Sequence, residues 1–174
     1  LFMFIFTIKS IAIFIMVGIF YCVPFTGNQA QAIASTWDKE TAPLLSFSKE
    51  ITVYRSPYCS CCEKWVKHMQ KHGFQIKDDI KTENMEAIKQ EYQVPSQLES
   101  CHTAIIDGYV MEGHVPADDI KRFVAQSSKQ IGLSVPGMVS GSPGMEMGNK
   151  KDPFPVVSFD NNGETQIFKE YRSY

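Results

Sequence analysis

The sequence has no strong excess of either charge and no run of basic residues. Its 17 lysines and arginines are balanced by 19 aspartates and glutamates, which gives a formal net charge of −2 at pH 7. Nucleic-acid binding depends on clustered positive charge, so this balance argues against a nucleic-acid partner. The length of 174 residues predicts one domain, and 44% hydrophobic residues can supply a folded core.

The sequence also lacks the motifs of common hydrolases and transferases. It contains no glycine-rich phosphate loop, no nucleophile paired with a base and no carboxylate pair at a catalytic spacing. Asp118 and Asp119 are adjacent, but both fall in the first turn of a predicted helix, where the helix dipole favours negative side chains. The sequence therefore leans against an enzyme and leaves a redox activity open.

Charge is almost absent from the first 37 residues. Lys9 is the only charged side chain there, and an apolar run covers 11–25 before small residues at 30–34. This pattern is typical of a cleavable export signal, which we predict over 1–32. A membrane anchor is the alternative, because residues 1–25 are long enough to span a bilayer. We expect an exported, periplasmic protein that is attached to the membrane only if this segment is retained.

Cysteine is concentrated in one short stretch. One of the 5 cysteines lies in the apolar N-terminal run, and three others occupy the four positions Cys59-Ser60-Cys61-Cys62. The remaining one, Cys101, is followed by His102. Four cysteines in an exported protein can form two disulfides. Adjacent cysteines close no long loop, however, so the triplet is a poor structural framework and favours metal or redox chemistry.

Strand and helix patterns alternate around these cysteines. A 3.6-residue period places Cys62 on the inner face of the first helix and leaves Cys59 at its entry loop. Thr82 is the expected cap of the second helix, and an Asp-Gly pair predicts a hairpin. The predicted strands and helices follow the order β-α-β-α-β-β-α over 51–54, 62–72, 74–77, 82–92, 103–106, 109–112 and 117–126.

This order, with Cys59 and Cys62 in a C-x-x-C spacing at the mouth of the first helix, resembles thioredoxin-like domains over 51–126. The expected fold class is therefore α/β, a three-layer α/β/α domain. The resemblance implies that the loop carrying Cys101 packs against the helix-mouth cysteines. We expect 33–50 to form a polar entry arm and 127–174 to form an irregular Gly/Met-rich loop and a terminal hairpin packed on the same domain.

Four blocks in the correct order carry a closer family resemblance. They look like the CopG-type proteins, a small exported family associated with copper resistance. That resemblance implies a thioredoxin-like fold that binds copper through its cysteines. The blocks are Tyr54–Trp65, Ser100–Ala104, Gly108–Ala117 and Gly132–Glu146.

Soft sulfur ligands suit Cu(I), and a helix N-terminus favours the thiolate form. Because Cys61 and Cys62 are adjacent, we expect bridging thiolates and more than one Cu(I) per chain. His102 can either bind the metal or hydrogen-bond a thiolate, and the case for His114 comes from the family resemblance. The candidate metal ligands are Cys59, Cys61, Cys62, Cys101, His102, His114, Met138, Met145 and Met147.

The methionines lie in a segment, 137–148, that contains four glycines and one proline. Such a segment cannot form a regular helix or central strand, so filling a helical core face does not explain them. Thioether sulfur binds Cu(I) without deprotonation. These side chains are therefore expected either to bind copper or to form a lid or docking loop.

The histidine pair His68 and His72 has the i, i+4 spacing of a metal site. The neighbouring residues Lys67 and Lys71 would repel a cation, and we predict that both histidines lie on a solvated helix face.

The sequence predicts an exported protein that sequesters or relays Cu(I), with copper ions and other exported copper-handling proteins as partners. An exported thiol-disulfide oxidoreductase using Cys59 and Cys62 is the alternative, and cluster-based electron transfer is a third. Zinc is not excluded, because four cysteines also satisfy a tetrahedral zinc site.

Overall fold

The structure is a computed structural model that describes residues 36–38, 48–126 and 129–174. The predicted export signal over 1–32 and most of the predicted entry arm lie outside the described residues. The described residues fall within one compact unit, Ile33–Tyr174. None of their helices combines the length and the apolar character needed to cross a bilayer.

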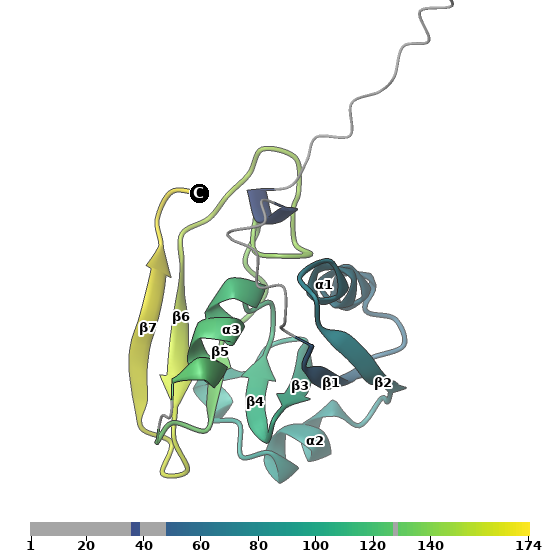
Figure 1. Cartoon of the computed structure of the whole chain (residues 1–174), viewed down its shortest axis with the longest axis vertical. Helices are drawn as coiled ribbons and strands as arrows, with labels where there is room; N and C mark the ends of the chain where they lie inside the picture. Colours follow the sequence, from purple (N-terminus) through teal and green to yellow (C-terminus); the bar gives the residue numbers. More distant parts are fainter. Residues whose placement is uncertain (1–35, 39–47, 127–128) are drawn as a thin grey trace, which may run out of the picture. The chain divides into compact units, whose positions relative to one another are not determined.

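The described strands form one seven-stranded sheet with three α-helices (Figure 1). The strand order is β2-β1-β3-β4-β5-β6-β7, in which β1 with β2 and β4 with β5 are parallel and the other pairs are antiparallel. The elements are η1 (Thr36–Asp38), β1 (Glu50–Arg55), α1 (Ser60–Lys71), β2 (Gln75–Lys81), α2 (Met85–Glu91), η2 (Ser96–Leu98), β3 (His102–Ile106), β4 (Tyr109–Glu112), α3 (Ala117–Ala125), β5 (Gly132–Ser134), β6 (Phe154–Phe159) and β7 (Thr165–Tyr171).

The seven elements predicted from the sequence are present in the predicted order, from β1 to α3. β5 was not predicted from the sequence, because its three residues are too few to show the alternation of apolar and polar side chains that marks a strand. Because β5 pairs with both β4 and β6, the terminal hairpin continues the central sheet as its outermost strands. Gly132 makes this close pairing possible, since a Cβ there would collide with the Val110 carbonyl and the Phe159 ring.

Helices pack on both faces of the sheet because successive strand side chains point to opposite sides. From β1, Val53 enters the larger apolar cluster together with Trp65 of α1 and Phe123 of α3. The next residue, Tyr54, points the other way, and its hydroxyl hydrogen-bonds that of Tyr92, just after α2. α1 begins at Ser60, shortly after β1 ends at Arg55, so the first turn of α1 lies beyond the carboxyl end of β1.

Two predicted boundaries differ from the structure. The second strand extends to Lys81, because an edge strand with one paired side tolerates the charged residues that argued against it. The second helix begins at Met85 and not near Thr82. Its cap is Asn84, which accepts a hydrogen bond from the Ala87 N–H at 3.3 Å, whereas the Thr82 hydroxyl accepts one from the Asn84 N–H.

Candidate metal centre

Three of the cysteines lie at the N-terminal turn of α1. Cys59 is the N-cap residue, and its sulfur accepts a hydrogen bond from the Cys62 N–H at 3.2 Å. Cys62 is fully buried, while Cys59 and Cys61 are half-buried. The predicted orientation, with Cys62 inward and Cys59 at the loop, is therefore confirmed.

A disulfide joins Cys59 to Cys62, with the two Cα atoms 5.3 Å apart. Cys61 and Cys101 are free thiols. The described part of the chain thus holds one bridge between near neighbours, not a framework of two disulfides. In this state the Cys61 sulfur lies 3.4 Å from that of Cys59.

Cys101 comes from the loop between η2 and β3. Antiparallel pairing of β1 with β3 places His102 opposite Arg55, so the residue before His102 reaches the α1 turn that follows β1. The sulfur of Cys62 lies 3.7 Å from the Cys101 carbonyl oxygen. The sulfur atoms of all four cysteines lie within 4.8 Å of one another, as the fold resemblance implied.

His114 also contacts Cys101. Its Nδ1 donates a hydrogen bond to the Pro143 carbonyl at 2.7 Å, because a carbonyl can only accept. In the neutral ring the lone pair is then on Nε2, which lies 3.0 Å from the Cys101 sulfur. Ligating histidines in metal sites are commonly held in this way by a carbonyl on the second nitrogen.

His102 is fully buried beside the same sulfur. Its Nδ1 is 3.9 Å from Cys101 Sγ, and its Nε2 has no hydrogen-bond partner among the described residues. Burial lowers the pKa of His102 well below its usual range, with the nearby His114 acting in the same direction, so this ring is neutral. Burial also lowers the pKa of His114. Cys101, His102 and His114 form a second cluster whose ligand atoms lie within 4.8 Å of one another.

Burial raises the pKa of the Cys101 thiol to about 12, and the nearby Cys61 adds to the shift. A helix N-terminus favours the thiolate form of nearby cysteines, but Cys101 lies on a loop and does not gain this effect. A cation bound there would replace the proton on this sulfur. Without a cation, Cys101 is a protonated thiol at neutral pH.

The methionine-bearing segment 137–148 lies against the same turn of α1. A Cβ at Gly144 would be 2.7 Å from the Trp65 backbone nitrogen and 2.9 Å from the Cys61 carbonyl oxygen, so this glycine is what allows the close approach. Met145 is half-buried, whereas Met138 is 65% and Met147 is 64% exposed. The structure thus brings the segment to the cysteines and leaves two of its three thioethers largely in solvent.

The prediction of a solvated face for His68 and His72 is wrong, because both side chains are buried. His68 Nε2 accepts a hydrogen bond from the Ala117 N–H at 3.2 Å, at the start of α3. His72 Nε2 donates to the Trp37 carbonyl at 2.7 Å. The lysines beside them do face solvent, but α3 and η1 cover the histidines, and no local pattern reveals such tertiary cover.

A buried ion pair lies beside the loop that carries Cys101 and was not predicted from the sequence. Glu112 and Lys89 are both buried and form an ion pair. Burial raises the pKa of Glu112, and the contacts with Lys89 and two further donors oppose that shift. The signal available was a glutamate at the end of an otherwise apolar hairpin strand.

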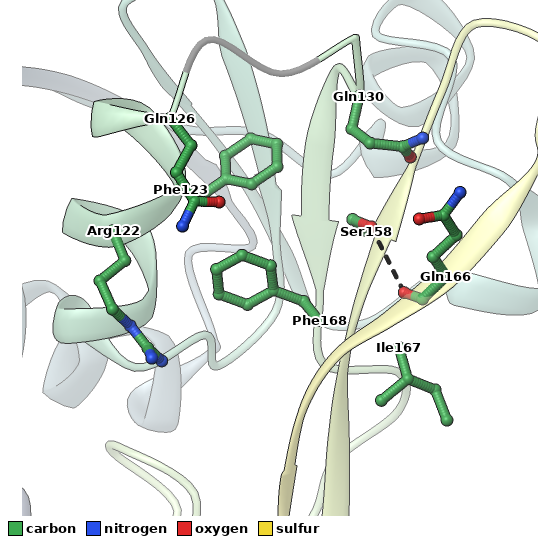
Figure 2. Close-up of a pocket in the computed structure, with 8 residues that line it drawn as sticks. All are labelled: Arg122, Phe123, Gln126, Gln130, Ser158, Gln166, Ile167 and Phe168. Atoms are coloured by element: carbon green, nitrogen blue, oxygen red, sulfur yellow. Dashed lines mark hydrogen bonds between the residues drawn. The ribbon is translucent and has the colours of Figure 1, made fainter.

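A separate pocket of about 370 Å³ shares no residue with the cysteine clusters. The guanidinium of Arg122 lies 5.5 Å from the ring centre of Phe168, and the Ser158 hydroxyl donates to the Gln166 carbonyl (Figure 2). Cysteine, histidine and carboxylate side chains are missing from its lining, so we place the candidate site at the sulfur cluster. The pocket is lined by Arg122, Phe123, Gln126, Gln130, Ser158, Gln166, Ile167 and Phe168.

Comparison with known proteins identifies the family. A solved structure titled "Copper resistance protein copG- Form 2" matches with 40% sequence identity and a TM-score of 0.68, covering 71% of this chain and 98% of that one. The chain belongs to the CopG family. A second CopG structure, Form 1, matches with 41% identity, a TM-score of 0.67 and the same coverage. Residues 98–145 match a family described as "Protein of unknown function, DUF411", and no curated protein matches.

The family prediction made from the four sequence blocks is therefore confirmed. Together, the CopG relatives and the cysteine cluster support a copper-related function for this chain.

Proposed function

We propose that this protein binds Cu(I) through its clustered cysteines and sequesters or relays the ion in copper resistance or homeostasis, outside the cytoplasm. The convergence of four sulfur atoms within 4.8 Å carries this proposal. Thiolates are soft ligands that prefer Cu(I), and the neutral His102 and His114 offer nitrogen lone pairs beside them. Copper is here the cargo of the protein.

The surroundings of His102 and the order of the strands also support this proposal. His102 is buried beside the Cys101 sulfur, with Nδ1 at 3.9 Å, and its Nε2 has no hydrogen-bond partner among the described residues, so the ring is not committed to a structural hydrogen bond through that atom. The order β2-β1-β3-β4, with β1 parallel to β2 and antiparallel to β3, supports a thioredoxin-like core. The Cys59–Cys62 disulfide must be reduced before all four sulfurs can bind metal as thiolates.

Titration of the reduced full chain with Cu(I), without oxygen and against a chromophoric chelator, tests this function. Because Cys61 and Cys62 are adjacent, we expect saturation above one equivalent and a strong sulfur-to-copper charge-transfer absorption. Cys61→Ser should lose copper, and Ser60→Ala, at the exposed neighbouring position, should keep it. Saturation at one equivalent would refute the shared-thiolate cluster. Native protein that contains zinc and no copper would refute the function.

Thiol-disulfide exchange is the second candidate, because the disulfide joins Cys59 and Cys62, the two cysteines in C-x-x-C spacing. The Cys61→Ser variant separates the two functions. A dithiol exchanger needs only Cys59 and Cys62, so its rate of reducing a model disulfide should survive this change. Loss of copper with exchange retained would leave two separable activities, and loss of both would make exchange depend on the metal site.

A further inference from the structure

Cys101 lies on a loop, so its position depends on contacts from elsewhere in the fold. The loop joins η2 to β3, and the last residue of β4 and the two residues after it meet the loop: Glu112, Gly113 and His114. His114 contacts the Cys101 sulfur from one side. The other two residues hold the backbone around that sulfur.

Glu112 is fully buried, and both oxygens of its carboxylate are used. Oε1 accepts a hydrogen bond from the Ser100 N–H at 2.6 Å, one residue before Cys101. Oε2 accepts one from the Thr103 hydroxyl at 2.7 Å, two residues after it. The Glu112 side chain thus forms hydrogen bonds with the loop on both sides of Cys101.

Lys89 of α2 supplies the positive charge that makes a buried carboxylate tolerable. Its ammonium group pairs with Glu112 Oε1 and lies 3.5 Å from the Thr103 hydroxyl. A buried carboxylate without a countercharge would be strongly destabilising. The ion pair therefore ties α2, β3 and β4 to the loop that carries Cys101.

Gly113 completes the contact. Its N–H donates to the His102 carbonyl at 2.8 Å, and its φ of +73° suits glycine. A Cβ at this position would collide with the Ser100 side chain. The loop can therefore lie directly on the end of β4, where Glu112 binds the residues on either side of Cys101 and His114 contacts its sulfur.

We propose that Glu112, neutralised by Lys89, is a positioning residue for the Cys101 sulfur in copper binding, an inference that rests on the proposed function. It acts through the Ser100 N–H and the Thr103 hydroxyl and makes no contact of its own with the metal. A carboxylate is required because every group that faces it is a donor. A glutamine would turn an NH2 group toward one of these donors.

The decisive measurement is a double-mutant cycle in the full chain, reduced and titrated with Cu(I) against a competing chelator. Glu112→Gln should weaken Cu(I) binding by about 10- to 100-fold, the usual cost of losing an outer-shell partner. In a Cys101→Ser background the same change should weaken binding less than threefold, because the residue through which Glu112 acts is gone. An equal loss in both backgrounds, or no loss in either, would overturn the proposal.

The matched control is Asp119→Asn, which alters another fully buried carboxylate whose partners are Arg122, Tyr171 and Lys169. This variant should unfold more easily and bind Cu(I) as the unmodified chain does. If Glu112→Gln fails to fold, Thr103→Val removes one donor to the carboxylate while keeping the shape of the strand residue. It should show a smaller loss of affinity that again disappears with Cys101→Ser.

Failure of the proposed function gives a different result. An unmodified chain that binds no Cu(I) would refute copper binding itself. An unmodified chain that binds Cu(I), with a Glu112→Gln variant that binds it equally well, would refute the positioning role alone.

Discussion

Gly144 offers a quantitative test of how the methionine-bearing segment is held against α1. Its φ is +84°, and an added Cβ would be 2.7 Å from the Trp65 nitrogen and 2.9 Å from the Cys61 carbonyl oxygen. Both neighbours are backbone atoms of a helix, so neither can rotate away. We expect Gly144→Ala to be destabilising through two separate effects.

The first effect is backbone strain, because alanine in the left-handed region costs about 1–2 kcal/mol. The second is steric overlap with α1, for which overpacking of a closely packed site costs about 1–3 kcal/mol. Gly148 separates these effects, because its φ is +60° and an added Cβ would meet nothing within 4 Å. Gly148→Ala should therefore show the first cost alone.

Urea unfolding, followed by tryptophan fluorescence and by circular dichroism, gives both free energies of unfolding. We expect Gly144→Ala to lose about 1–3 kcal/mol more than Gly148→Ala. The displaced segment should also weaken Cu(I) binding in the Gly144 variant, since the contact lies at Cys61. Equal stability losses in the two variants would show that Gly144 is not closely packed against α1.

Three further predictions concern the residues that support the site. Arg55 hydrogen-bonds Asp79 and lowers the pKa of this carboxyl below its usual value of 3.8. The pair therefore stabilises the fold fully above pH 3.8, and this stabilisation is lost as the pH falls through the lowered pKa of Asp79. The stability difference between the unmodified chain and Asp79→Asn should shrink in acid unfolding below about pH 4, and a constant difference would contradict this. The Trp37 indole N–H donates to the Gly141 carbonyl at 2.8 Å, so Trp37→Phe should cost about 0.5–1.5 kcal/mol in urea unfolding, whereas no change would rule out a stabilising contact. His68→Leu leaves a buried N–H at the start of α3 without its acceptor and should cost about 1–3 kcal/mol, well above the effect expected if His68 were exposed.

Local sequence patterns predicted the parts of the site that lie on regular elements. The helical period oriented Cys62 correctly, and the Asp107-Gly108 turn located the β3–β4 hairpin. The approach of Cys101 to the triplet came from the fold resemblance, because no local pattern records a contact across 39 positions. Periodicity and turn residues carry information about neighbours along the chain, so they predicted the local elements and not the contacts between them.

The two features of the site that were missed, the buried His68 and the buried Glu112, depend on contacts between distant segments. Burial of His68 depends on α3, and burial of Glu112 depends on Lys89 from α2. A polar residue is expected at the surface unless a partner is known, and these partners lie 49 and 23 positions away. The export signal and the cellular compartment remain predictions from the sequence.

The short span of the Cys59–Cys62 disulfide has a consequence for the whole fold. A bridge between residues three positions apart closes a very small loop, and the chain-entropy estimate for such a loop is about 2 kcal/mol, against roughly 4.7 kcal/mol for a loop of 100 residues. Opening the bridge therefore removes less than half of the constraint on the unfolded chain that opening a bridge across 100 residues would remove. Oxidation and folding are coupled by that smaller amount, because the bridge joins two residues of one turn and no two strands of the sheet.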